Sequence, residues 1–139
     1  MQTAVVRCSL RDRKSGTEFT VDLISTVHLA ASEYYAALQR SCDTQYDRVC
    51  FEMIADDTCF DTDPSGTRYL VQPLEASKQQ RALAAQYGLA AQTDSLDCTG
   101  RRYVHADTLR SELGHCGTTL SSGGPLLARM REAWDGIVQ

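Results

Sequence analysis

The stretch Phe19–Ile54 constrains the fold more than any other part of this sequence. It begins with alternating apolar and polar residues and becomes apolar on both sides, as in a strand that enters a core. A helical segment follows from Ser32, the expected N-cap, to about Ser41. Arg48–Ile54 then has the apolar character of a strand covered on both faces. This order predicts a βαβ unit with two parallel neighbouring strands.

The residues before this unit predict an N-terminal β-hairpin. Thr3–Leu10 and Glu18–Thr26 are strand-like, and the polar segment Arg11–Thr17 between them contains Gly16. Further along we expect an acidic loop over Ala55–Val71 and a helix over Glu75–Tyr87. An extended segment, Tyr103–Asp107, should lead into a short helix, Thr108–Leu113, and a last amphipathic helix should begin at Pro125. The pattern predicts a mixed α/β fold, with the hairpin leading into the βαβ unit and several helices packed on the sheet. The 139 residues fit a single domain.

Composition removes several classes of function. The net charge is -4 and the 14 basic residues are scattered, so we expect no nucleic-acid partner. No apolar run approaches the roughly 18 residues of a membrane span, and no signal peptide is recognisable. We therefore expect a soluble protein, cytoplasmic or organellar. The six cysteines include no C-x-x-C pair, which favours buried or free thiols over a disulfide or zinc framework.

Two polar residues follow the predicted parallel strands and form a candidate site. His28 comes just after the first strand, and Glu52 lies near the end of the second. Parallel neighbouring strands would place both side chains at the same sheet edge, where α/β proteins build their sites. The pair could be part of a metal-ligand set, a general acid/base pair or a buried hydrogen-bonded couple. His105 is a further candidate ligand, and Asp107 is either an N-cap or a site residue.

Several short motifs in this region resemble the TraB/PrgY/GumN family, which is related to the Tiki metalloproteases. The motifs that carry the resemblance are Ser25-Thr26-Val27-His28, Asp47 to Glu52 (D-R-V-C-F-E), Tyr87-Gly88-Leu89, Gln92, Asp94 to Asp97 (D-S-L-D) and Val104-His105-Ala106-Asp107. They match, in order, a G-T-x-H strand end, a D-x-V-x-x-E strand and a Y-G-L-x-x-Q-x-x-x-L-D…V-x-A-D pattern. The resemblance covers residues 22–107.

The resemblance implies a metal-dependent hydrolase or peptidase acting on a peptide or small-molecule substrate. On this basis His28 and Glu52 would be both catalytic and metal-binding residues, with Asp107 a further ligand of a divalent metal ion. The chain departs from the family in two ways: Ser25 replaces the glycine of G-T-x-H, and no second G-x-x-H motif follows. We therefore expect a TraB-like domain that is incomplete on its C-terminal side. The alternatives are a non-catalytic, PrgY-like peptide-binding or regulatory domain, and a fragment active only through self-association or with a missing second half.

Overall fold

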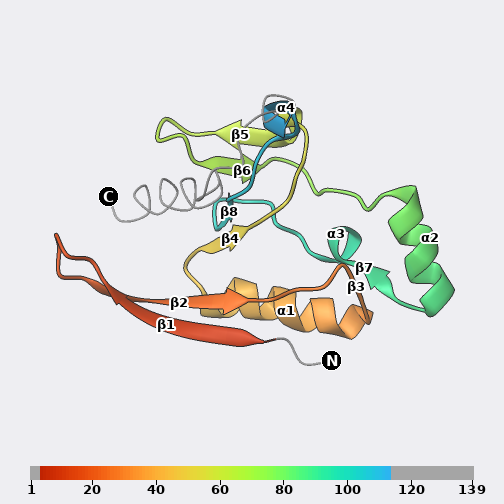
Figure 1. Cartoon of the computed structure of the whole chain (residues 1–139), viewed down its shortest axis with the longest axis horizontal. Coiled ribbons are helices and arrows are strands. Elements are labelled where there is room, and N and C mark those ends of the chain that lie inside the picture. The colour runs from red at the N-terminus through yellow and green to blue at the C-terminus, as the bar shows by residue number, and fades with distance from the viewer. Residues whose placement is uncertain (1–3, 114–139) are drawn as a thin grey trace.

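The computed structural model describes residues 4–113, which form a mixed α/β fold of small sheets and helices (Figure 1). The predicted fold class is confirmed at this level. The predicted helix that begins at Pro125 lies outside the described residues. No helix in the described part is long and apolar enough to cross a membrane.

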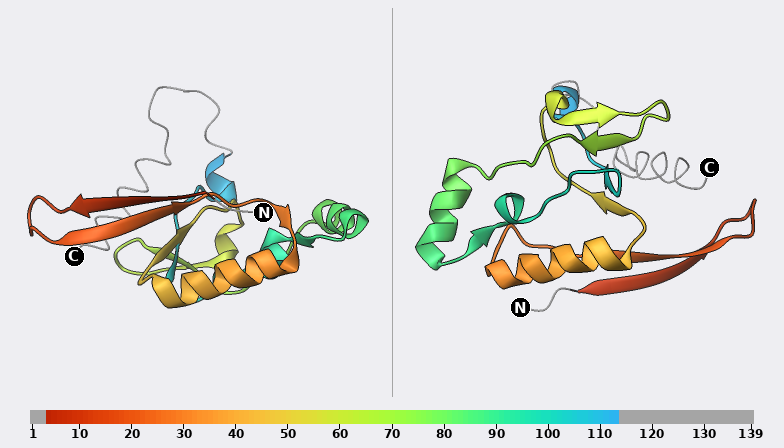
Figure 2. Two further views of the ribbon diagram at one scale, coloured as in Figure 1. Left: turned by 90° about the horizontal axis from the view of Figure 1, so that it is seen from below. Right: turned by 180° about the vertical axis from the view of Figure 1, so that it is seen from behind.

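An antiparallel hairpin of β1 (Val5–Arg11) and β2 (Glu18–Ile24) opens the chain, as predicted. Its turn is organised by Asp12, whose carboxylate accepts hydrogen bonds from the backbone N–H groups of Lys14 (3.1 Å) and Ser15 (2.9 Å). Gly16 has φ of 73°, a left-handed conformation that glycine adopts without steric cost. The turn end of the hairpin extends away from the rest of the described structure (Figure 2).

Helix α1 (Ser32–Gln45) follows the hairpin and is one turn longer than predicted. Its N-cap is Ala31 and no side chain caps it, so the expectation that Ser32 would be the N-cap is wrong. The start of the helix is held instead by Tyr35, which is buried and whose hydroxyl donates to the backbone oxygen of Val27 (2.7 Å). The two-residue strand β3 (Leu29–Ala30), just before the helix, pairs with β7 (Ala90–Ala91).

The strand after α1 does not pair with β2. β4 (Val49–Phe51) pairs in parallel with β8 (Tyr103–His105), while β2 pairs with β1 alone among the described strands. The predicted parallel neighbours of the βαβ unit are therefore wrong. A hairpin closes a short loop at low entropic cost, so β2 makes its backbone hydrogen bonds with β1, its neighbour in the sequence. β4 gains more by pairing with β8, whose three side chains are all buried.

The segment predicted to be an acidic loop contains ordered structure. The 3-10 turn η1 (Asp57–Cys59) leads into a hairpin of β5 (Phe60–Thr62) and β6 (Arg68–Leu70). Asp63 organises the turn by accepting hydrogen bonds from the backbone N–H groups of Ser65 (2.9 Å) and Thr67 (3.0 Å). The aspartates and glycine that indicated a loop are thus the signals of a tight hairpin turn.

The second long helix, α2 (Lys78–Tyr87), follows the predicted pattern with a later start. Ser77 and Gln80 form a reciprocal capping box at its N-terminus, and Gly88 (φ of 62°) ends it in a left-handed C-cap, as predicted. Two single-turn helices complete the described chain, α3 (Gln92–Ser95) and α4 (Arg110–Leu113).

The core lies around β8, between β4 and β6. Val104 and Tyr103 are buried there, together with Leu70 of β6. His105 is buried in the same layer, with its ring 4.1 Å from that of Phe60 between centroids and its Nε2 hydrogen-bonded to the backbone oxygen of Met53 (2.7 Å). This histidine is therefore placed as a core residue rather than at an open strand end.

Candidate functional site

A groove of about 350 Å³ separates one face of the hairpin from helix α1. The strands line it with Val5, Arg7, Asp22 and Ile24, and the helical side adds Tyr34, Ala37, Leu38, Ser41, Gln45 and Tyr46. The antiparallel register explains the strand side, because Val5 pairs with Ile24 and Arg7 pairs with Asp22, so all four side chains share one face. The groove therefore joins an apolar lining to a charged pair.

Asp22 is the buried centre of the charged end. Arg7 binds it through two parallel hydrogen bonds, from Nε to Oδ1 (2.8 Å) and from Nη2 to Oδ2 (2.7 Å). The hydroxyl of Tyr46 donates a third, to Oδ2 (2.8 Å). Because Tyr46 is the C-cap residue of α1, this carboxylate fastens the hairpin to the end of the helix.

The two charged partners differ sharply in exposure. The Asp22 side chain is 1% exposed and that of Arg7 is 69% exposed. Hydrogen bonding by Arg7, and next by Tyr46, lowers the pKa of Asp22 from 3.8 to about 2. The same pairing raises the pKa of Arg7, and burial followed by the bond to Asp22 raises the pKa of Tyr46. The negative charge is therefore enclosed, while the guanidinium presents a positive charge to solvent.

A second ion pair with additional hydrogen bonds lies between α2 and α3. Arg81 binds Asp94 from Nε to Oδ2 (2.7 Å) and from Nη2 to Oδ1 (2.9 Å), and also contacts Glu75 (3.0 Å). Asp94 accepts a further bond from the backbone N–H of Ala76 (2.8 Å), and these partners, Arg81 first, lower its pKa to about 2. Since Asp94 uses its oxygens to hold the segment before α2, we assign it a structural role.

The structure places His28 and Glu52, the two residues expected at a shared sheet edge, in different surroundings. Both are exposed. His28 precedes β3, and its backbone oxygen accepts the N–H of Gln92 (2.9 Å). Glu52 directly follows β4, which belongs to the sheet with β8. The strand pairing that would have joined them at one edge is not formed.

Asp107, the third expected metal ligand, lies two residues after the end of β8. Its Oδ1 accepts the N–H of Thr108 (2.7 Å), and its backbone oxygen accepts Nη2 of Arg68 (2.9 Å). The alternative role, as N-cap of a helix from Thr108, is not met, because α4 begins at Arg110; the Asp107 side chain instead bonds the backbone of the next residue.

The described residues do not supply a set of ligands for a metal ion. Within residues 4–113, no three His, Cys, Asp or Glu side chains lie together in a group that could hold one. Structural zinc sites use four protein ligands and catalytic zinc sites use three. The metal ion implied by the family resemblance stays a prediction.

Comparison with known proteins found no match to any family model, curated protein or solved structure. The TraB/PrgY/GumN resemblance therefore stays a prediction.

The groove was missed because its residues lie in separate predicted elements. The sequence does carry one signal. When the two predicted strands are paired around the hairpin loop, Arg7 lies opposite Asp22 and Arg11 lies opposite Glu18, so the same register forms two pairs of opposite charge. That signal identifies the hairpin face. The approach of Tyr46 depends on how α1 packs, which local patterns do not encode.

Proposed function

We propose that this chain is a non-catalytic binding domain that holds a short peptide, or a small molecule of similar chemistry, in the groove between the hairpin and α1. The groove itself supports the proposal, because ligand sites are concave, mostly apolar and equipped with a few fixed polar groups. Its volume lies in the lower part of the range for such sites, about 300–1,000 Å³.

The lining indicates the kind of ligand. Val5, Ile24 and Leu38 offer apolar surface to a ligand. Each Å² of apolar surface that the ligand removes from water contributes about 25 cal/mol to the free energy of binding. Arg7 gives Nε and Nη2 to Asp22, and its Nη1 is a further donor directed by the same planar group. A guanidinium held in place by a carboxylate is pre-organised for a second carboxylate. The favoured ligand therefore has an apolar side chain next to a carboxylate, as at the C-terminus of a peptide.

The test compares two leucine-rich tetrapeptides that differ only in a free C-terminal carboxylate or an amide, titrated into isotope-labelled protein and followed by NMR. We expect the free acid to bind about ten-fold more tightly and to shift the resonances of groove residues, since hydrogen bonds to charged groups contribute about 1.5–3 kcal/mol. Arg7→Gln should remove this preference.

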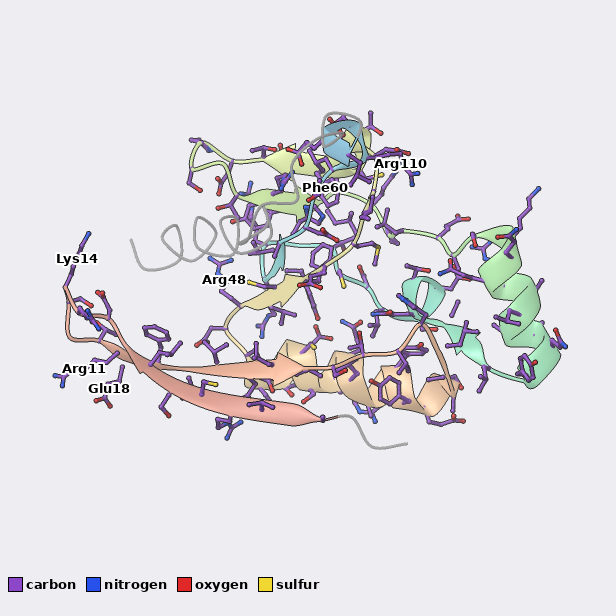
Figure 3. The ribbon with its side chains drawn as sticks, viewed as in Figure 1. Arg11, Lys14, Glu18, Arg48, Phe60 and Arg110 are labelled. Carbon is purple, nitrogen blue, oxygen red and sulfur yellow. The ribbon has the colours of Figure 1, made fainter. Side chains whose placement is uncertain are left out.

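Arg11→Gln is the matched control, because Arg11 pairs across the same hairpin but lies at its tip, outside the groove (Figure 3). It should keep the preference. Equal binding of acid and amide, or shifts confined to residues outside the groove, would contradict the proposal.

The metal-dependent hydrolase implied by the resemblance is a separate prediction with its own test. Zinc titrated into the full chain by calorimetry should bind the wild type more tightly than His28→Ala or Glu52→Ala if these two residues are ligands. Unchanged affinity in both variants would remove them from a metal site and leave the binding-domain proposal untouched.

A further inference from the structure

β1 is a seven-residue strand at the edge of its sheet. Among the described strands it pairs with β2 alone, over all seven residues. The other edge of β1 therefore has no partner strand within residues 4–113. Every second residue of such a strand directs its N–H and C=O away from its neighbour. Proline and bulges normally block an open edge, and β1 has neither.

One face of the hairpin is also apolar and exposed. Val6, Cys8 and Leu10 alternate along β1 on the side opposite to Arg7 and the groove, and Val6 is 56% and Leu10 45% exposed. Leu23 extends this face on β2 and is also exposed. A two-stranded ribbon is marginal by itself, whereas a sheet of four strands with one apolar face is far better supported.

The charges on β1 select one way of pairing with a second copy. If two β1 strands pair about a two-fold axis normal to the sheet, each residue lies opposite a residue of the other copy that is on the same face of the sheet. A centre at Arg7 would put Arg7 against itself, and a centre at Ser9 would put Arg7 against Arg11; like charges directly opposite are destabilising. A centre at Cys8 pairs all seven residues of β1, with Val6 opposite Leu10 and Arg7 opposite Ser9.

We propose that β1 is the dimerisation edge of this protein: the β1 strands of two copies run antiparallel about a two-fold axis at Cys8, giving a sheet in the order β2–β1–β1–β2. The interface is isologous, as in most homodimers. Because the axis is normal to the sheet, the groove faces of both hairpins lie on the same side of the four-stranded sheet, and Arg7 borders both its own groove and the interface.

Two substitutions of opposite charge at Ser9 test the register. In the dimer each Ser9 meets Arg7 of the other copy, and the contact occurs twice. Ser9→Lys should therefore weaken the dimer about ten-fold and Ser9→Glu should tighten it by a similar factor, as measured by sedimentation of the full chain over a concentration series. Thermal unfolding of both variants reports whether the hairpin itself is intact. A monomeric wild type up to about 1 mM, or a shift of both variants in one direction, overturns the proposal.

Crosslinking provides a second readout that does not depend on Ser9. A variant that keeps Cys8 as its one cysteine should form dimers with a short bismaleimide, because directly opposed residues have Cβ atoms about 5 Å apart. The matched control keeps only Cys50, which is exposed on β4. Rapid crosslinking of the Cys8 variant alone supports the two-fold at Cys8, and equal crosslinking of the two variants overturns it.

Discussion

Asp22 shows how one residue can connect two elements. It faces Arg7 across the hairpin and receives the hydroxyl of Tyr46 from the end of α1. A buried carboxylate is costly unless it is paired and hydrogen-bonded, and here three donors satisfy it. The position of the hairpin relative to the helix therefore depends on the ionised form of this side chain.

That dependence predicts a pH effect. The folded state lowers the pKa of Asp22 from 3.8 to about 2, so its stabilisation is present above about pH 4 and is lost as the pH falls towards 2. The difference in melting temperature between wild type and Asp22→Asn should be largest at neutral pH and shrink across this window. Thermal denaturation by circular dichroism at several pH values measures it.

Glu18→Gln is the control, because Glu18 occupies the equivalent cross-strand position opposite Arg11 but is exposed. It should change the melting temperature much less at neutral pH, and this small change should vary little with pH. If the difference in melting temperature between wild type and Asp22→Asn stays constant down to about pH 2, the charge of the Asp22 carboxylate does not stabilise the contact between the hairpin and α1.

Residue patterns did not predict the groove as a site. His28 and Glu52 were placed at a shared edge because each follows an apolar strand, and that inference required β2 and β4 to pair. Arg7 and Asp22 were predicted to lie in the hairpin but not to form a site. Their role depends on Tyr46, which lies between the predicted helix ending near Ser41 and the predicted strand beginning at Arg48.

Among the elements, β8 contributes most to the core. Its three residues are all buried, and it contacts both β4 and β6. Val104 is 1% exposed at its centre. Removing two methyl groups from such a site costs their transfer free energy and leaves a cavity.

Val104→Ala should therefore lower the free energy of unfolding by about 2 kcal/mol. The matched control is Val71→Ala, at a residue just after β6 that is 56% exposed and should change stability by less than about 0.5 kcal/mol. Urea denaturation of both variants gives the two values. Equal effects would mean that β8 is not the centre of the core.

The elements that the sequence predicted best are those with local signals. The hairpin has alternating strands around Gly16, and α2 has strong helix formers and Gly88 at its end. The β5–β6 hairpin was missed because each strand has only three residues, too few for a period of two to stand out.

At the scale of the whole molecule, fold class was predictable and strand order was not. Local patterns give helices and strands, but they do not say which strand lies next to β4. Its neighbour, β8, comes from a distant part of the chain and was predicted only as an extended segment. The choice between β2 and β8 is made by burial, because β8 lies in the core and β2 lies in a hairpin that extends from it.

The pairing of β4 with β8 also has a consequence during synthesis. β1 and β2 are adjacent in the chain and can pair as soon as both leave the ribosome. β4 emerges next, but Val49 pairs with Tyr103, so this strand must wait until most of the described chain has been made. In that interval the nascent protein carries a finished hairpin beside an unfinished core, and Phe51 and the neighbouring apolar residues are exposed to chaperones.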